Sequence, residues 1–206
     1  MVRDLGDHAA RTERRSSRRH VLAGAALATV GGASLIERLL RAGDALASPS
    51  KALDARILQL VLQLEYTHVA FYEQALQDAG LQGELRVFAR TALGHERQHL
   101  AAIRRALGSK AGARPSFDFG QSTKSQDAFR RTAIKLEDIA VAAYNGQATN
   151  LTAPTLAAAA TIVSVEARHA AWVRAIEGEV AAPDPVDKPM TASQAAAGLH
   201  QIGLKP

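Results

Sequence analysis

The sequence predicts an all-α protein, an antiparallel four-helix bundle with a long crossover between its second and third helices. Three observations lead to this prediction. The composition is rich in alanine and poor in aromatic residues and proline, which favours helices over sheets. Apolar residues recur at intervals of three and four in four separate segments. The connection between the second and third segments is much longer than the other two, as in bundles that need a crossover.

The first two helices are bounded by glycines. The apolar spacing predicts a helix over 50–80, and Gly80 is a suitable residue to end it. The second helix is predicted over 84–107, before Gly108. The stretch 109–124 that follows contains glycine, proline and phenylalanine, and we expect it to be the crossover.

The second pair of helices and a tail complete the bundle region, which we place at 48–180. A third helix is predicted over 125–146, and a fourth from its expected cap, Thr152, to about 178. The tail, 181–206, is rich in proline. We expect it to wrap the bundle in an extended form, with a short helix at 192–200.

The first 47 residues have the organisation of an export signal. A basic stretch ends in Ser17-Arg18-Arg19, an apolar run follows, and Ala45-Leu46-Ala47 is a small-x-small cleavage pattern. The paired arginines resemble the twin-arginine type of signal peptide. We therefore expect the twin-arginine export machinery as a partner and a periplasmic or extracellular location. The apolar run is shorter than the roughly 20 residues of a membrane-spanning helix. No stable span is expected in the mature form, with an uncleaved anchor as the alternative.

Charge and cysteine content exclude several classes of function. The chain has 25 basic and 20 acidic residues, and eight arginines against five acidic residues lie within 1–47. The basic excess is therefore concentrated in the leader, so we expect no nucleic-acid partner. The absence of cysteine excludes disulfides, thiolate zinc sites, iron–sulfur clusters and a thiol nucleophile.

Each predicted helix carries a glutamate in the stripe that should be apolar. These residues are Glu65, Glu96, Glu137 and Glu166. A buried, unpaired carboxylate is unfavourable or takes up a proton. Four carboxylates in one core need compensation, and two divalent cations would balance their charge.

Histidines follow two of these glutamates at helical spacing. In Glu96–His99 and Glu166–His169 the two residues are three positions apart, so both side chains lie on one face and can reach the same ion. An oxygen-rich site with one imidazole per ion suits Fe or Mn better than Cu.

The two halves of the sequence also repeat. Tyr72 follows Glu65 by seven residues, and Tyr144 follows Glu137 by the same interval. Two helical turns place each tyrosine on the face of its glutamate, where its hydroxyl can bond to a ligand carboxylate.

Three further features are assigned to packing or solvent. His68 shares a stripe with Glu65 but has no counterpart in the other half, so we expect it to lie in the core beside the ligands. His95 is about 100° around the helix from Glu96 and is expected to be exposed. Ala157–Ala160 is expected to be a close-packed helix face.

Over about 50–180 the sequence resembles the ferritin-like superfamily of di-iron and di-manganese carboxylate proteins. The resemblance implies two Fe or Mn ions per chain. Its ligand set implies that Glu96 and Glu166 bridge the ions, that Glu65 and Glu137 are terminal ligands, and that His99 and His169 bind one ion each.

A closer likeness is to exported or stress-associated ferritin-like domain proteins. It rests on Phe71-Tyr72, on the segment 165–170 around Glu166, and on the segment 187–191 in the tail. The resemblance implies oxidation of Fe(II) or reduction of oxygen or peroxide. The alternatives are a non-catalytic metal-binding protein and a structural stress-protection protein of the cell envelope. By analogy we expect a small oligomer, such as a homodimer.

Overall fold

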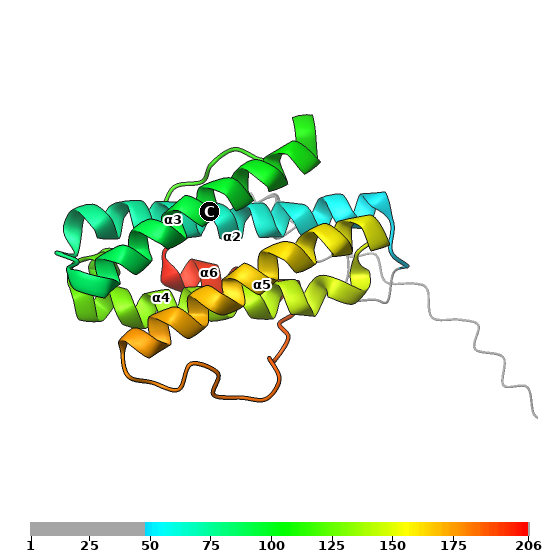
Figure 1. The fold of residues 1–206 in the computed structure, drawn as a ribbon. Helices are drawn as coiled ribbons and strands as arrows, with labels where there is room; N and C mark the ends of the chain where they lie inside the picture. The colour runs from blue at the N-terminus through cyan, green and yellow to red at the C-terminus, as the bar shows by residue number, and fades with distance from the viewer. Residues whose placement is uncertain (1–47, 206) are drawn as a thin grey trace, which may run out of the picture. The chain divides into compact units, whose positions relative to one another are not determined.

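The computed structural model describes residues 48–205. Four long helices form the bundle in this part of the chain (Figure 1): α2 (Lys51–Asp78), α3 (Gly83–Leu107), α4 (Gln126–Gln147) and α5 (Ala153–Ile176). Helix α2 packs mainly on α3, and α4 mainly on α5, as two antiparallel hairpins. The described residues form no β-strand, only an isolated bridge between Phe117 and Leu204. The predicted all-α bundle is confirmed.

The connections differ in length as the sequence predicts. A short turn joins α2 to α3, and the 3-10 helix η3 (Ala148–Asn150) joins α4 to α5. The long crossover from α3 to α4 contains two further 3-10 helices, η1 (Gly108–Lys110) and η2 (Gly120–Thr123). It returns the chain to the end of the bundle from which α3 started, so α3 and α4 run in the same direction.

Side-chain caps begin two of the four bundle helices. The hydroxyls of Ser50 and Ser125 accept hydrogen bonds from backbone amides three residues later, in α2 and α4 respectively. Thr152 occupies the N-cap position of α5, as predicted, but its hydroxyl makes no such bond. It donates instead to Asp54 of α2 at 2.5 Å, so it ties α5 to α2.

The tail contributes a fifth α-helix of the described residues to the core. After an irregular stretch that runs along the bundle, α6 (Ala192–Ile202) packs on α4 and α2 and buries Ala195, Ala196, Leu199 and Ile202. The amide of Met190 donates to the Ala142 carbonyl at 2.9 Å. A Cβ atom at Gly146 would overlap the Met190 carbonyl, so this close approach requires glycine.

The start of α5 departs from the prediction. Within Ala157–Ala160 only Ala159 is buried, and the other three residues are exposed. The expected close-packed face is wrong because the end of α3 diverges from the start of α5 (Figure 1).

Two predictions concern membranes and export. No helix in the described range 48–205 is long and apolar enough to cross a membrane. The predicted signal peptide, 1–47, lies outside the described residues.

Candidate metal centre

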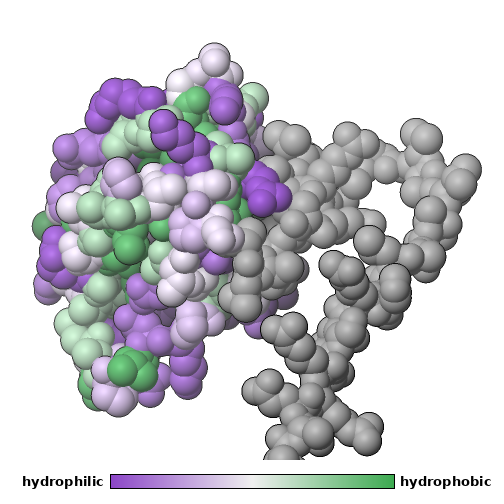
Figure 2. Space-filling model, turned by 90° about the vertical axis from the view of Figure 1, so that its right-hand side faces the viewer, coloured by the Kyte–Doolittle hydropathy of each residue, from purple (hydrophilic) through white to green (hydrophobic). Residues whose placement is uncertain are grey.

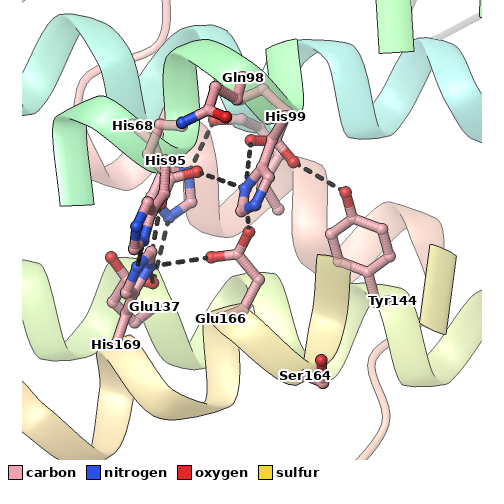
Figure 3. A network of polar contacts seen from close by, with 12 residues as sticks. His68, His95, Gln98, His99, Glu137, Tyr144, Ser164, Glu166 and His169 are labelled. Carbon is pink, nitrogen blue, oxygen red and sulfur yellow. Dashed lines mark hydrogen bonds and ion pairs between the residues drawn. The ribbon is translucent and has the colours of Figure 1, made fainter. Parts of the chain in front are cut away.

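One glutamate from each long helix reaches the middle of the bundle. Glu65, Glu96, Glu137 and Glu166 are all fully buried, and Figure 3 shows the site from close by. Small buried residues such as Ala92 and Ala133, one turn before Glu96 and Glu137, flank the carboxylates. The four predicted helix stripes that carry a glutamate therefore meet at a single level of the core.

His99 and its neighbours form the first of two groups of possible metal ligands. Its Nδ1 atom lies 2.9 Å from Glu166 Oε1, 3.1 Å from Glu96 Oε2 and 3.8 Å from Glu65 Oε2. One donor atom from each of these four residues lies within 4.8 Å of the others, a spacing at which they can hold a metal ion.

His169 is the centre of the second group. Its Nδ1 atom lies 3.0 Å from Glu96 Oε1, 3.5 Å from Glu137 Oε2 and 3.6 Å from Glu166 Oε2. The same 4.8 Å spacing holds for these four residues. Glu96 and Glu166 belong to both groups, so the two clusters share two carboxylates.

Many polar atoms of the cluster have no hydrogen-bond partner. Buried atoms without a hydrogen-bond partner include Glu65 Oε2, Glu96 Oε1, Glu137 Oε2, both Glu166 carboxylate oxygens and His169 Nδ1. Such buried atoms are unfavourable unless something else binds them. Oxygen and nitrogen lone pairs that face a common space are what divalent cations require, so the residues present fit metal ions.

The pKa values reflect this excess of negative charge. Burial raises the pKa of Glu65 well above its usual value, and the charges of Glu166 and Glu96 raise it further. Burial also raises the pKa of Glu137 to about 7. Protons are therefore held on these carboxyl groups when no cation replaces them.

The pKa values of the two imidazoles, those of His99 and His169, are also raised, although burial acts on them in the opposite direction. Burial alone would lower their pKa values, but the negative charges of the carboxylates in contact with them outweigh it. The pKa of His99 rises to about 9 through Glu166 and Glu96, and that of His169 to about 12 through Glu137, Glu166 and Glu96.

Both tyrosines reach carboxylates, and they do so across the bundle. Tyr144 of α4 donates to Glu65 Oε1 of α2 at 2.8 Å. Tyr72 of α2 donates to Glu137 Oε1 of α4. Each tyrosine therefore orients the glutamate of the other half rather than that of its own helix.

His68 lies at the cluster, closer to it than the sequence indicates. Its side chain is fully buried, and Nδ1 is 2.9 Å from the Leu64 carbonyl oxygen. Because a carbonyl only accepts, Nδ1 carries the hydrogen, and in the neutral imidazole Nε2 is available as a donor of an electron pair. Nε2 has no hydrogen-bond partner and lies 3.9 Å from Glu137 Oε2. His68 is thus a further side chain that can hold a cation, and its sequence signal is the third Glu-x-x-His pair.

The prediction that His95 is exposed is wrong. Its side chain is partly buried, and its ring stacks on that of His169 with 5.2 Å between centroids. His95 Nδ1 lies 2.9 Å from His169 Nε2, the ring nitrogen opposite the carboxylates. A metal-binding histidine commonly has such a partner on its other nitrogen, which fixes the ring orientation.

The cluster opens to solvent between α3 and α5. A cavity of about 470 Å³ is lined by His95, Gln98, His99, Val165, Arg168, His169 and Trp172. Both imidazoles of the two ligand groups border it, so small molecules and ions can reach the centre from this side.

The fold and site define a class, the helical bundles whose core holds carboxylates and imidazoles where apolar residues are usual. A family model for the ferritin-like domain matches residues 53–179, and the chain belongs to this family. A comparison with curated proteins gave no match. The resemblance to the ferritin-like superfamily, stated from the sequence, is confirmed by this match.

Proposed function

We propose that the protein binds two Fe or Mn ions in this cluster and oxidises Fe(II) or reduces oxygen or peroxide there. The observation that carries the proposal is the convergence of four buried glutamates, each of which has at least one oxygen without a hydrogen-bond partner. The chemistry that bound Fe or Mn ions supply is the transfer of electrons to oxygen or peroxide.

The residues of the chain would divide the binding roles by their positions. Glu96 and Glu166, which belong to both groups, would bridge the two ions. Glu65 with His99 would complete one position, and Glu137 with His169 the other. His68 Nε2 is placed to add a donor on the Glu137 side.

Neighbouring side chains would hold these ligands in place. The tyrosine hydroxyls bond to one oxygen of Glu65 and one of Glu137, which leaves the second oxygen of each for a cation. His95 would fix the ring of His169. The carboxylates themselves are fully buried, and the opening between α3 and α5 exposes the imidazole side of the cluster.

Oxygen uptake on addition of Fe(II) to the full chain tests the proposal. We expect uptake in the wild-type protein and in Ser164→Ala, an exposed position on α5, and none above background in Glu166→Ala. Metal binding without oxygen or peroxide consumption would refute turnover and favour a sequestering protein. No metal binding would refute the metal centre itself.

We also propose that residues 1–47 direct export through the twin-arginine machinery to the cell envelope. The support is the order of basic, apolar and small-residue regions. Arg18→Lys/Arg19→Lys should retain the protein inside the cell, as measured by fractionation, and unchanged export would refute the twin-arginine route.

A further inference from the structure

A second cavity lies at the end of the bundle where α2 and α5 begin. Its volume is about 500 Å³, within the roughly 300–1,000 Å³ range of small-molecule sites. Helices α2, α3 and α5 form its walls with mainly apolar side chains: Ala55, Leu58, Ala102, Ala106, Ala158 and Ala159. Figure 2 looks onto this end of the molecule, where hydrophobic residues are exposed among hydrophilic ones.

The floor of this cavity borders the candidate metal centre. Val61, Ile103 and Ile162 line it, and each is four residues from a member of the His99 group: Glu65, His99 and Glu166 respectively. Tyr144 also lines the cavity and donates its hydroxyl hydrogen to Glu65. The floor of the cavity is therefore one helical turn from the carboxylates along α2, α3 and α5, and Tyr144 lies between the cavity and Glu65.

The mouth of the cavity is positively charged. Lys51 and Lys110 line the cavity and are exposed, so their ammonium groups are available at its mouth. The one carboxylate in the lining, Asp54, is buried. It already accepts hydrogen bonds from the Thr152 amide, the Thr152 hydroxyl and the Thr155 hydroxyl at 2.9, 2.5 and 2.7 Å.

We propose that this cavity binds a single alkyl chain with an anionic head, of the free fatty-acid type. The apolar walls accept the chain, the two lysines bind the carboxylate, and the far end of the chain reaches the floor near Tyr144. The volume suits one chain of a small ligand. Binding itself does not depend on metal, and only a role of the ligand as substrate rests on the proposed function.

The test is equilibrium binding of a dansyl-labelled undecanoic acid to the full chain, followed by displacement with palmitate. Ala102→Phe and Ala158→Phe place a ring in the cavity from different walls, and Ala101→Phe, exposed and outside the lining, is the matched control. We expect each filling variant to weaken binding at least tenfold and the control to change it less than twofold. Thermal melts confirm folding, and Ala158→Phe, at an exposed position, serves if Ala102→Phe fails to fold.

Two further arms separate the parts of the proposal. Lys51→Gln/Lys110→Gln should weaken displacement by palmitate but not by hexadecanol, which lacks the charge. Binding should persist in protein treated with a chelator, so a failed metal centre leaves this result intact. Equal affinity in wild type and filling variants would overturn the proposal. Absence of binding in a protein that sediments as a dimer would overturn it in favour of a second copy covering the cavity.

Discussion

The core is built differently on the two sides of the carboxylate layer, the level of the bundle at which Glu65, Glu96, Glu137 and Glu166 meet. On one side all five phenylalanines of the sequence form a continuous set of ring contacts: Phe71, Phe88, Phe117, Phe119 and Phe129. On the other side Val61, Ile103 and Ile162 border a cavity of about 500 Å³. One end of the core is filled, and the other is open to a ligand.

The two tyrosines show what this difference does. Tyr72 and Tyr144 occupy equivalent positions in the sequence repeat and make equivalent bonds to glutamates. Tyr72 is enclosed by the rings of Phe71, Phe88 and Phe129, with centroids 5.6–5.9 Å away. Tyr144 borders the cavity instead. The sequence repeat therefore determines which residues form the carboxylate layer, whereas the side chains around each tyrosine determine whether a cavity reaches that layer.

Removing a large side chain from each end of the core should give the largest difference in the free energy of unfolding. Phe88→Ala leaves a void in a fully buried aromatic cluster and should lower the free energy of unfolding by about 3–5 kcal/mol. Ile162→Ala enlarges a cavity that already exists, and should cost about 2 kcal/mol, the low end for such changes. Urea unfolding measures both. Equal losses would contradict the contrast between a filled end and an open one.

The stability of the metal-free protein and the stabilisation gained on metal binding should respond oppositely to pH. In metal-free protein the pKa values of Glu137 (about 7) and His169 (about 12) are raised, so the folded state binds more protons than the unfolded state. Their stabilisation is present at low pH. It is lost as pH rises from about 4.5 to 7 for Glu137 and from about 6.5 to 12 for His169.

Between pH 5 and 8 the melting temperature of the metal-free protein should therefore fall. Glu96, whose pKa is lowered by the nearby histidines despite its burial, titrates below this window. Metal binding requires deprotonated ligands, so the rise in melting temperature on adding Mn(II) should grow over the same interval. A metal-induced rise that is independent of pH would contradict the assignment of these groups as ligands.

Removing each tyrosine hydroxyl should give a smaller difference in stability between the two ends of the core. Tyr72→Phe leaves a Glu137 oxygen without its donor in a sealed environment, and should cost about 1–3 kcal/mol of stability in metal-free protein. Tyr144→Phe should cost less, because water in the cavity can reach Glu65. Thermal melts of both variants in chelator test this order, and a larger loss for Tyr144→Phe would reverse it.

The sequence predicts the ligand layer better than its surroundings. Glutamate and histidine spacing within one helix places Glu96 and His99 on a common face, because helical periodicity is a local property. The stacking of His95 on His169 depends on how closely α3 approaches α5, which spacing within a single helix does not contain. For the same reason the exposed alanines at the start of α5 and the cavity beside them could not be predicted.

Metal content tests the central claim most directly. The full chain, purified without chelator, would be analysed for Fe and Mn beside Glu96→Ala/Glu166→Ala, with the exposed Glu179→Ala as control. The shared carboxylates predict about two ions per chain in wild type and control, and none in the double variant. No metal in any of the three proteins, or undiminished metal in the double variant, would contradict the account.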